Sequence, residues 1–241
     1  MSEQQRSLRS IPKIVKWLLF LSLGLQIMGY YQLPKLQIKI QTLSSPPQAE
    51  LLRLFSLGDP IVSAKILMLW VQAYNNQAGQ FLSNEELNYL NLRQWLEQIL
   101  LIDPKGQYPL LAASHIYLTV KDKNKQRQML DFVYQQFLID PYHRWRWLAH
   151  ATILAKHKLK DLPLALKYAK AITAYANPKM PFWAKEMQIF ILEDMGEFEQ
   201  AQLIIGGILI SGQITDPNEI KFLNDKLNML EEQAIENHNA N

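Results

Sequence analysis

The tetrapeptide Leu101-Ile102-Asp103-Pro104 returns 37 residues later as Leu138-Ile139-Asp140-Pro141. Similar Asx-Pro steps stand at Asp59-Pro60, Asn177-Pro178 and Asp216-Pro217. The residue before a proline is pushed out of the helical region of backbone conformation, whereas proline itself suits the first turn of a helix. Each step therefore predicts the end of one helix and the start of the next. The intervals between steps leave room for two helices of about 14–17 residues and a short turn.

The segments between these steps have the apolar spacing of amphipathic helices. Leu130, Val133 and Phe137 share one helical face, and Trp95 and Ile99 share another. Strand-like alternation is nearly absent after residue 40. We therefore expect an all-α body of about ten helices in antiparallel pairs. This body covers residues 49–232, and a disordered polar tail follows at residues 233–241.

The helix-turn-helix pairs resemble tetratricopeptide repeats. The match is clearest where Gly196 precedes Phe198 and Ala201, which correspond to the turn, the second helix and its close-packing position in that consensus. Residues 162–169 match the second helix more loosely. The resemblance implies an α-solenoid of TPR-like helix-turn-helix pairs. Because the spacing of the steps exceeds the usual period of about 34 residues, HEAT-like pairs with a longer period remain an alternative.

A second resemblance concerns the start of the body. The stretch Ser56-Leu57-Gly58-Asp59-Pro60, together with residues 67–74, resembles the opening of membrane-anchored, repeat-containing bacterial proteins of uncharacterised function. This resemblance implies a fold and a membrane attachment, and it names no activity.

An uncharged stretch of 18 residues runs from Trp17 to Pro34. As a helix it covers about 27 Å, close to the thickness of the hydrocarbon core of a bilayer. Trp17 at one end and Tyr30-Tyr31 at the other are the aromatic residues expected at the membrane interfaces. We predict a transmembrane helix over residues 14–33, whose apolar residues are Trp17, Leu18, Leu19, Phe20, Leu21, Leu23, Leu25, Ile27 and Met28.

A cleaved signal peptide and a buried globular helix are the alternatives for this segment. The residues that follow the apolar run, Met28 to Gln32, offer no small-x-small cleavage site, and residues 17–25 carry almost no polar stripe. Four Lys or Arg residues precede the helix, while only Lys35 and Lys39 follow it closely. The positive-inside rule then places the basic N-terminus, residues 1–13, in the cytoplasm. The linker, residues 34–48, and the body then lie in the periplasm of a bacterium, with the helix in the inner membrane.

The net charge of +3 belongs to the first segment of the chain. Residues 1–35 hold five Lys or Arg and one Glu, whereas the other residues hold 20 basic and 21 acidic side chains. Such a body does not favour nucleic-acid binding, which needs a clustered basic surface. Within the body, residues 121–170 hold 11 basic and 4 acidic side chains, and residues 186–236 hold 2 and 11. Such charged faces are most often simply solvated. The alternatives are that the separation steers an acidic partner, stacks copies end to end, or places the basic part on anionic lipid headgroups.

No catalytic signature is present, and the chain has no cysteine. Glu193 and Asp194 are adjacent, so on a helix they point about 100° apart and do not form a facing acid–base pair. His143, His150 and His157 are seven residues apart, and a rise of about 10.5 Å between them prevents any two from sharing one metal ion. We expect the three histidines to line one polar face of a helix or its groove. We therefore expect no enzyme activity, no cofactor, no metal and no small-molecule substrate.

The segment around residues 142–150 combines basic and aromatic side chains of the kinds that anchor protein interfaces. We predict that this segment contacts a protein partner; alternatives are that Trp145 or Trp147 fills the core between repeats, or that these rings stack on a carbohydrate. The predicted contact residues are Arg144, Trp145, Arg146, Trp147 and His150, with Lys123, Lys125 and Arg127 as rim charges. Gly206-Gly207 lies in an apolar helix and predicts close helix packing, or the docking of a partner helix.

These observations lead to two hypotheses about function. The first is a membrane-anchored, non-catalytic scaffold or adaptor that binds another protein in a bacterial cell-envelope assembly. The second is an accessory subunit that is integrated into a membrane enzyme or a secretion or pilus complex through its transmembrane helix.

Overall fold

The computed structural model describes residues 12–32, 42–54, 58–77, 80–175, 180–212 and 214–240. In these ranges the regular structure is helical apart from two strands of two residues each. The chain divides into two units, residues 1–41 with 78–80 and residues 42–77 with 81–241. The predicted all-α class, with one apolar helix near the N-terminus, is confirmed.

The helix of the first unit is α1 (Lys13–Gln32). None of its residues is buried by protein, and an 18-residue window within it has a mean hydropathy of 1.4. Its 20 residues rise about 30 Å, which is long enough to cross a bilayer. Ser22 donates from Oγ to the Leu19 carbonyl at 2.9 Å, so this hydroxyl is satisfied within the helix, as a hydrocarbon environment requires. The basic N-terminus up to residue 11 and residues 33–41 of the linker lie outside the described residues.

The second unit is a helical body. Its α-helices are α2 (Ala49–Leu54), α3 (Pro60–Ala73), α4 (Tyr89–Ile102), α5 (Tyr108–Leu111), α6 (Lys123–Ile139), α7 (Pro141–Leu154), α8 (Leu162–Ala174), α9 (Phe182–Asp194), α10 (Phe198–Ser211) and α11 (Pro217–Ala240). The shorter elements are β1 (Asn76–Gln77), β2 (Gln80–Phe81), the 3-10 helices η2 (Asn84–Glu86) and η4 (Tyr117–Thr119), and the π-helical turns η3 (Ala112–Ile116) and η5 (Ala155–Leu159).

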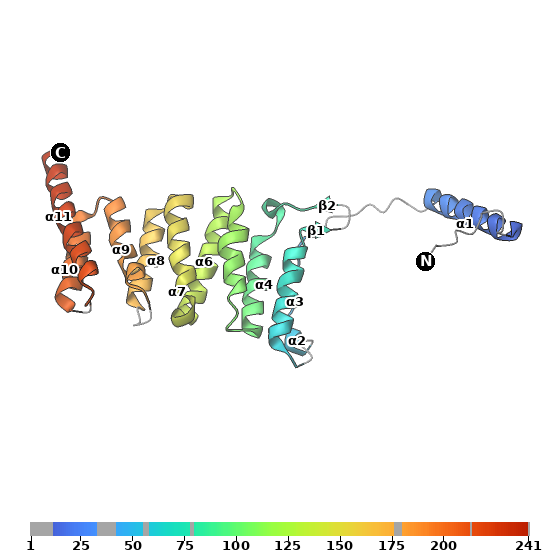
Figure 1. Ribbon diagram of the computed structural model, residues 1–241, viewed down its shortest axis with the longest axis horizontal. Helices are drawn as coiled ribbons and strands as arrows, with labels where there is room; N and C mark the ends of the chain where they lie inside the picture. The colour runs from blue at the N-terminus through green and yellow to red at the C-terminus, as the bar shows by residue number, and fades with distance from the viewer. Residues whose placement is uncertain are drawn as a thin grey trace, which may run out of the picture. The chain divides into compact units, whose positions relative to one another are not determined.

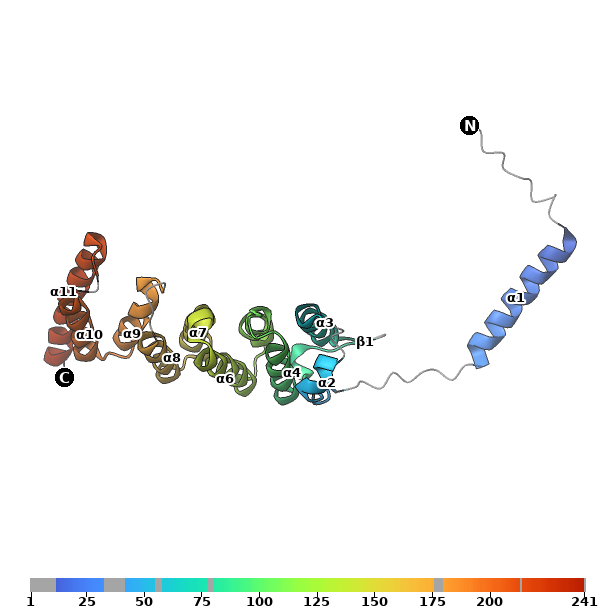
Figure 2. The same cartoon turned by 90° about the horizontal axis from the view of Figure 1, so that it is seen from below.

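The body helices follow one another in chain order along the body (Figure 1). From α6 to α11 each helix packs against the next, and α4 packs against α3 and α6. Figure 2 shows two rows, with α3, α7 and α9 in one and α4, α6 and α8 in the other. Contacts are therefore made mainly between neighbours in sequence.

Pro60, Pro141 and Pro217 each begin a helix, as predicted. The step Asp103-Pro104 ends α4 but does not begin a helix, because α5 begins at Tyr108. The Asp59 carboxylate accepts hydrogen bonds from the amides of Ile61 and Val62 at the start of α3, 3.0 Å each, with Pro60 in the first turn. The backbone amide of Asp140 closes α6 on the Gln136 carbonyl, and its side chain caps α7. Each aspartate satisfies helix-terminal groups that would otherwise be unpaired. The step at residues 177–178 lies outside the described residues.

Two apolar clusters form the core of the body. The larger one extends from Leu43 to Ile191, and the smaller one joins α9, α10 and α11. Ala201 is fully buried in the smaller cluster, and Gly196 has a φ of +76° at the turn before α10. These placements agree with the turn and packing positions expected from the sequence.

Two features of the last helices differ from expectation. The prediction of close helix packing at Gly206 and Gly207 is wrong, because a Cβ atom at either position would meet nothing within 4 Å. Both glycines lie on an outward face of α10 beside Leu203 and Ile210, which are 77% and 88% exposed. Helix α11 also continues to Ala240, through most of the segment for which the sequence favoured a disordered tail.

Candidate protein-binding surface

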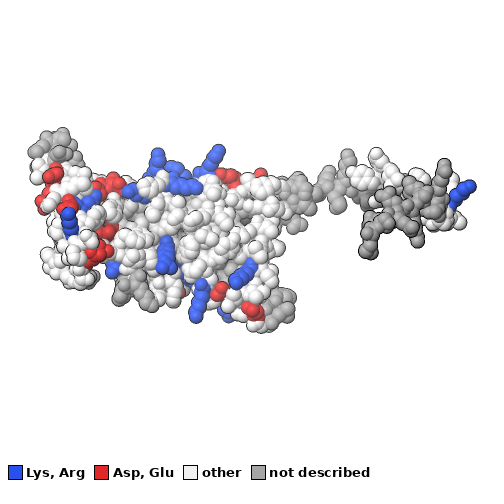
Figure 3. All heavy atoms as spheres, in the orientation of Figure 1, with Lys and Arg blue, Asp and Glu red and all other residues white. Residues whose placement is uncertain are grey.

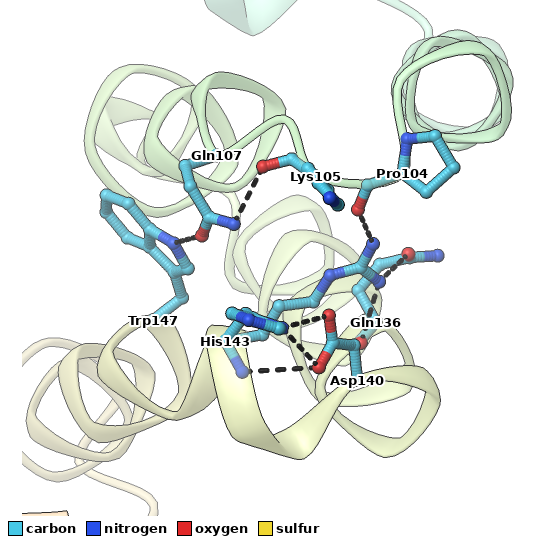
Figure 4. A network of polar contacts seen from close by, with 8 residues as sticks. Pro104, Lys105, Gln107, Gln136, Asp140, His143 and Trp147 are labelled. Atoms are coloured by element: carbon cyan, nitrogen blue, oxygen red, sulfur yellow. Dashed lines mark hydrogen bonds and ion pairs between the residues drawn. The ribbon is translucent and has the colours of Figure 1, made fainter. Parts of the chain in front are cut away.

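Arg144 lies on α7 and is 3% exposed. Its Nη1 donates to the backbone oxygen and to Oε1 of Gln136, at 2.9 and 2.7 Å, and its Nη2 donates to the Pro104 carbonyl at 2.8 Å. The accepting groups of Pro104 and Gln136 are labelled in Figure 4. Arg144 therefore binds both the preceding helix, α6, and the turn that follows α4. Desolvation lowers the pKa of its guanidinium, and the nearby Asp140 carboxylate partly offsets this.

Trp147 makes the same kind of connection from the next turn of α7. Its indole Nε1 donates to Gln107 Oε1 at 2.6 Å, and Gln107 Nε2 donates to the Lys105 carbonyl at 3.1 Å (Figure 4). Trp145 is buried, with its ring centroid 5.8 Å from that of Trp183 on α9. Two of the predicted contact residues, Arg144 and Trp145, thus serve packing between helix pairs, and Trp147 is half-buried in a similar role.

His150 is stacked on His115 from the preceding pair. The ring centroids are 4.1 Å apart and the planes differ by 6°. Burial and the neighbouring His115 lower the pKa of His150. His143 instead binds the Asp140 carboxylate through Nδ1, and His157 lies in the π-helical turn η5. His143, His150 and His157 therefore have different surroundings and do not share one polar helix face.

The predicted rim charges divide into two kinds. Lys125 donates from Nζ to the carbonyls of Glu85 and Leu87, and Arg127 forms an ion pair with Asp161 at 2.5 Å. Lys123 is exposed. Arg146, on α7, is also exposed, and its guanidinium lies over the ring of Trp145. Lys125 and Arg127 connect neighbouring helix pairs, while Lys123 and Arg146 face solvent.

A surface groove opens between α4 and α6, with a volume of about 580 Å³. Its apolar rim includes Leu101 and Ile139, which are 51% and 71% exposed although both are large aliphatic side chains. Arg144 also lines this groove, beside Pro104. Sequence reasoning missed Leu101 and Ile139 as surface residues. The available signal was that both fall outside the periodic apolar stripes of their helices.

Charge is separated along the body (Figure 3). Basic side chains gather over α6 to α8 and acidic ones over α9 to α11. Glu193 and Asp194 are held in ion pairs with Lys226 and Lys156, respectively.

Within the part of the chain that the structure describes, no group of three His, Asp or Glu side chains could hold a metal ion.

Comparison of the chain with protein-family models, with curated proteins and with solved structures finds no match. The resemblance to tetratricopeptide repeats therefore remains a prediction from the sequence.

Proposed function

We propose that this protein is a non-catalytic, single-span membrane protein whose body, an α-solenoid of TPR-like helix pairs, binds another protein in a bacterial cell-envelope assembly. The observation that carries the proposal is that hydrogen bonds between residues 40 positions apart join neighbouring helix pairs. Arg144 and Trp147 of α7 donate such bonds to Pro104 and Gln107, in the turn after α4. Such joining supports a continuous surface that presents grooves to a partner. Helix α1 supplies the membrane attachment in this proposal.

In the proposed topology the N-terminus lies in the cytoplasm and the body in the periplasm. The basic residues before α1 support this orientation. The chain has no cysteine, so a single introduced cysteine is a unique label. In cells with a permeabilised outer membrane, an impermeant maleimide is expected to label Lys170→Cys and to leave Ser7→Cys unlabelled. The reverse pattern contradicts the proposed topology.

A second candidate is an accessory subunit that is held in a membrane complex by α1 itself. Gly24 and Gln26 favour it, because small and polar residues are typical of helix–helix contacts in membranes. Replacement of residues 14–33 by an unrelated spanning helix separates the two candidates. The adaptor proposal predicts that the same protein chains co-purify in mild detergent after the replacement. Their loss supports the accessory subunit.

A further inference from the structure

Arg144 is a buried cation without an acidic partner. Among the described residues the ion pairs do not include it, and its hydrogen bonds go only to uncharged oxygens. The carboxylate of Asp140 influences it electrostatically but accepts its hydrogen bonds from His143. Buried charges in proteins are normally paired, because desolvation of an isolated charge is costly.

The guanidinium also has unused hydrogen-bonding capacity. An arginine has five N–H donors, and the three bonds to Gln136 and Pro104 use three of them. The buried Nε has no partner. An N–H on Nε and one on Nη2 therefore remain, and arginine binds a carboxylate through two such donors.

Arg93, which lines the same groove, provides a contrast. Its guanidinium binds Glu97 and Asp131, at 2.8 Å each, so two carboxylates surround it. Of the two arginines that line the groove, Arg144 is thus the one whose hydrogen bonds go to no carboxylate. Around it the groove is apolar, with Leu100, Leu101 and Ile139 among its lining residues.

We propose that the groove between α4 and α6 binds an extended peptide segment of a partner protein that carries a carboxylate next to a large apolar side chain. The carboxylate of the peptide pairs with Arg144, and the apolar side chain lies against Leu101 and Ile139. This inference rests on the proposed function and specifies the chemistry of the partner. It explains why a cation is buried here and why two aliphatic side chains beside it are left in water.

The test uses the full chain in nanodiscs and a phage-displayed library of random ten-residue peptides. Selected peptides are expected to be enriched in Asp or Glu flanked by large apolar residues. Calorimetry with a selected peptide is expected to show binding about 30-fold or more tighter than with its Glu→Gln or Asp→Asn counterpart, the size expected for a buried charge pair. Arg144→Met removes this preference.

Two further variants keep the test independent of the folding of Arg144→Met. Ile139→Glu places a negative charge at an exposed site of the groove, and is expected to abolish peptide binding. The matched controls are Lys170→Met, an exposed basic residue on α8, and Leu203→Glu, an exposed aliphatic residue on α10. Both controls are expected to bind the peptide as the unaltered chain does.

Several outcomes would overturn the inference. They are a selection that yields no peptide, selected peptides without a carboxylate, and binding that Ile139→Glu leaves unchanged. A groove that is occupied by a second copy of the chain, detected as a dimer that Ile139→Glu dissociates, also overturns it. Each of these leaves the proposed function to be judged separately by the co-purification experiment with the replaced α1.

Discussion

Arg144 Nη2 donates a hydrogen bond to the backbone carbonyl of Pro104, 2.8 Å away and 40 residues earlier in the chain. Pro104 belongs to the step Asp103-Pro104, and Arg144 follows the next step, Asp140-Pro141. The bond therefore joins two successive helix pairs. Lys158 makes a similar contact with the Leu118 carbonyl, also 40 residues earlier. Successive helix pairs are thus held by polar side chains as well as by their apolar core.

The first prediction concerns this connection. Arg144→Ala removes the Arg144 donor from the Pro104 carbonyl and from Gln136 Oε1, leaves the Gln136 carbonyl with the Asp140 amide alone, and opens a void beside α6. We expect the free energy of unfolding to fall by about 2 kcal/mol, the usual cost of buried polar groups that lose a partner. Urea denaturation followed by circular dichroism measures it. Arg146→Ala, at an exposed site, is the control and is expected to change the value by less than about 0.5 kcal/mol. Equal effects of the two substitutions would contradict the structural role of Arg144.

The second prediction concerns Glu186, which is buried on α9 with Oε1 unpaired. Burial, and to a smaller extent Glu219, raises the pKa of this carboxyl to about 6. The folded state therefore holds its proton more tightly than the unfolded state, and stability is lost as the pH rises from about 4.5 through 6. Glu186→Gln is expected to stabilise the body by about 2 kcal/mol at pH 7.5 and to have little effect below pH 4.5. A stabilisation that does not depend on pH would refute this account of Glu186, and exposed Glu197→Gln is the control.

The third prediction concerns the stacked pair His115 and His150. Because the pKa of His150 is lowered in the folded state, the unfolded state binds more protons below the ordinary histidine pKa. Stability should therefore decrease as the pH falls below about 6.5. His150→Phe keeps an aromatic ring on His115 and removes the charge, so its stability should fall less steeply. Identical slopes for the two chains between pH 7 and pH 5 would show that His150 does not contribute.

The fourth prediction concerns the glycines of α10. Gly206 and Gly207 are helical with open space around them, so Gly206→Ala and Gly207→Ala should each stabilise the body by about 0.5–1 kcal/mol. Gly196 has a positive φ, so Gly196→Ala should instead destabilise it by about 1 kcal/mol. Thermal unfolding distinguishes the three variants. A loss of stability in the α10 variants would mean that this face is covered within the protein.

The helix boundaries could be predicted because they depend on local chemistry. Asp59 and Asp140 cap helices through groups two or three residues away, so the sequence alone contains the cause. The surface could not be predicted in the same way. Whether Arg144 or Arg146 is buried depends on which side of α7 faces the turn at Pro104, a contact set by packing 40 residues away.

The prediction that His143, His150 and His157 share one polar helix face is wrong for a different reason. The prediction assumed one uninterrupted α-helix through residues 143–157, but α7 ends at Leu154 and a π-helical turn displaces His157. The glycines of α10 could not be interpreted from the sequence either. An apolar helix with two glycines has the same sequence pattern whether that face is packed or exposed. Burial of a helix face is decided by its neighbours.

The most direct test of the central claim is site-directed photo-cross-linking in native membranes. Single cysteines at Lys123, Gln135 and Lys170 of the body, and at Leu21 of α1, each carry a photoreactive group on a chain that otherwise lacks cysteine. We expect covalent adducts with another protein chain from body positions, Gln135 beside the groove among them, and no such adduct from Leu21. Adducts from Leu21 alone, or no protein adduct from any body position, would contradict the claim that the helical body binds a partner.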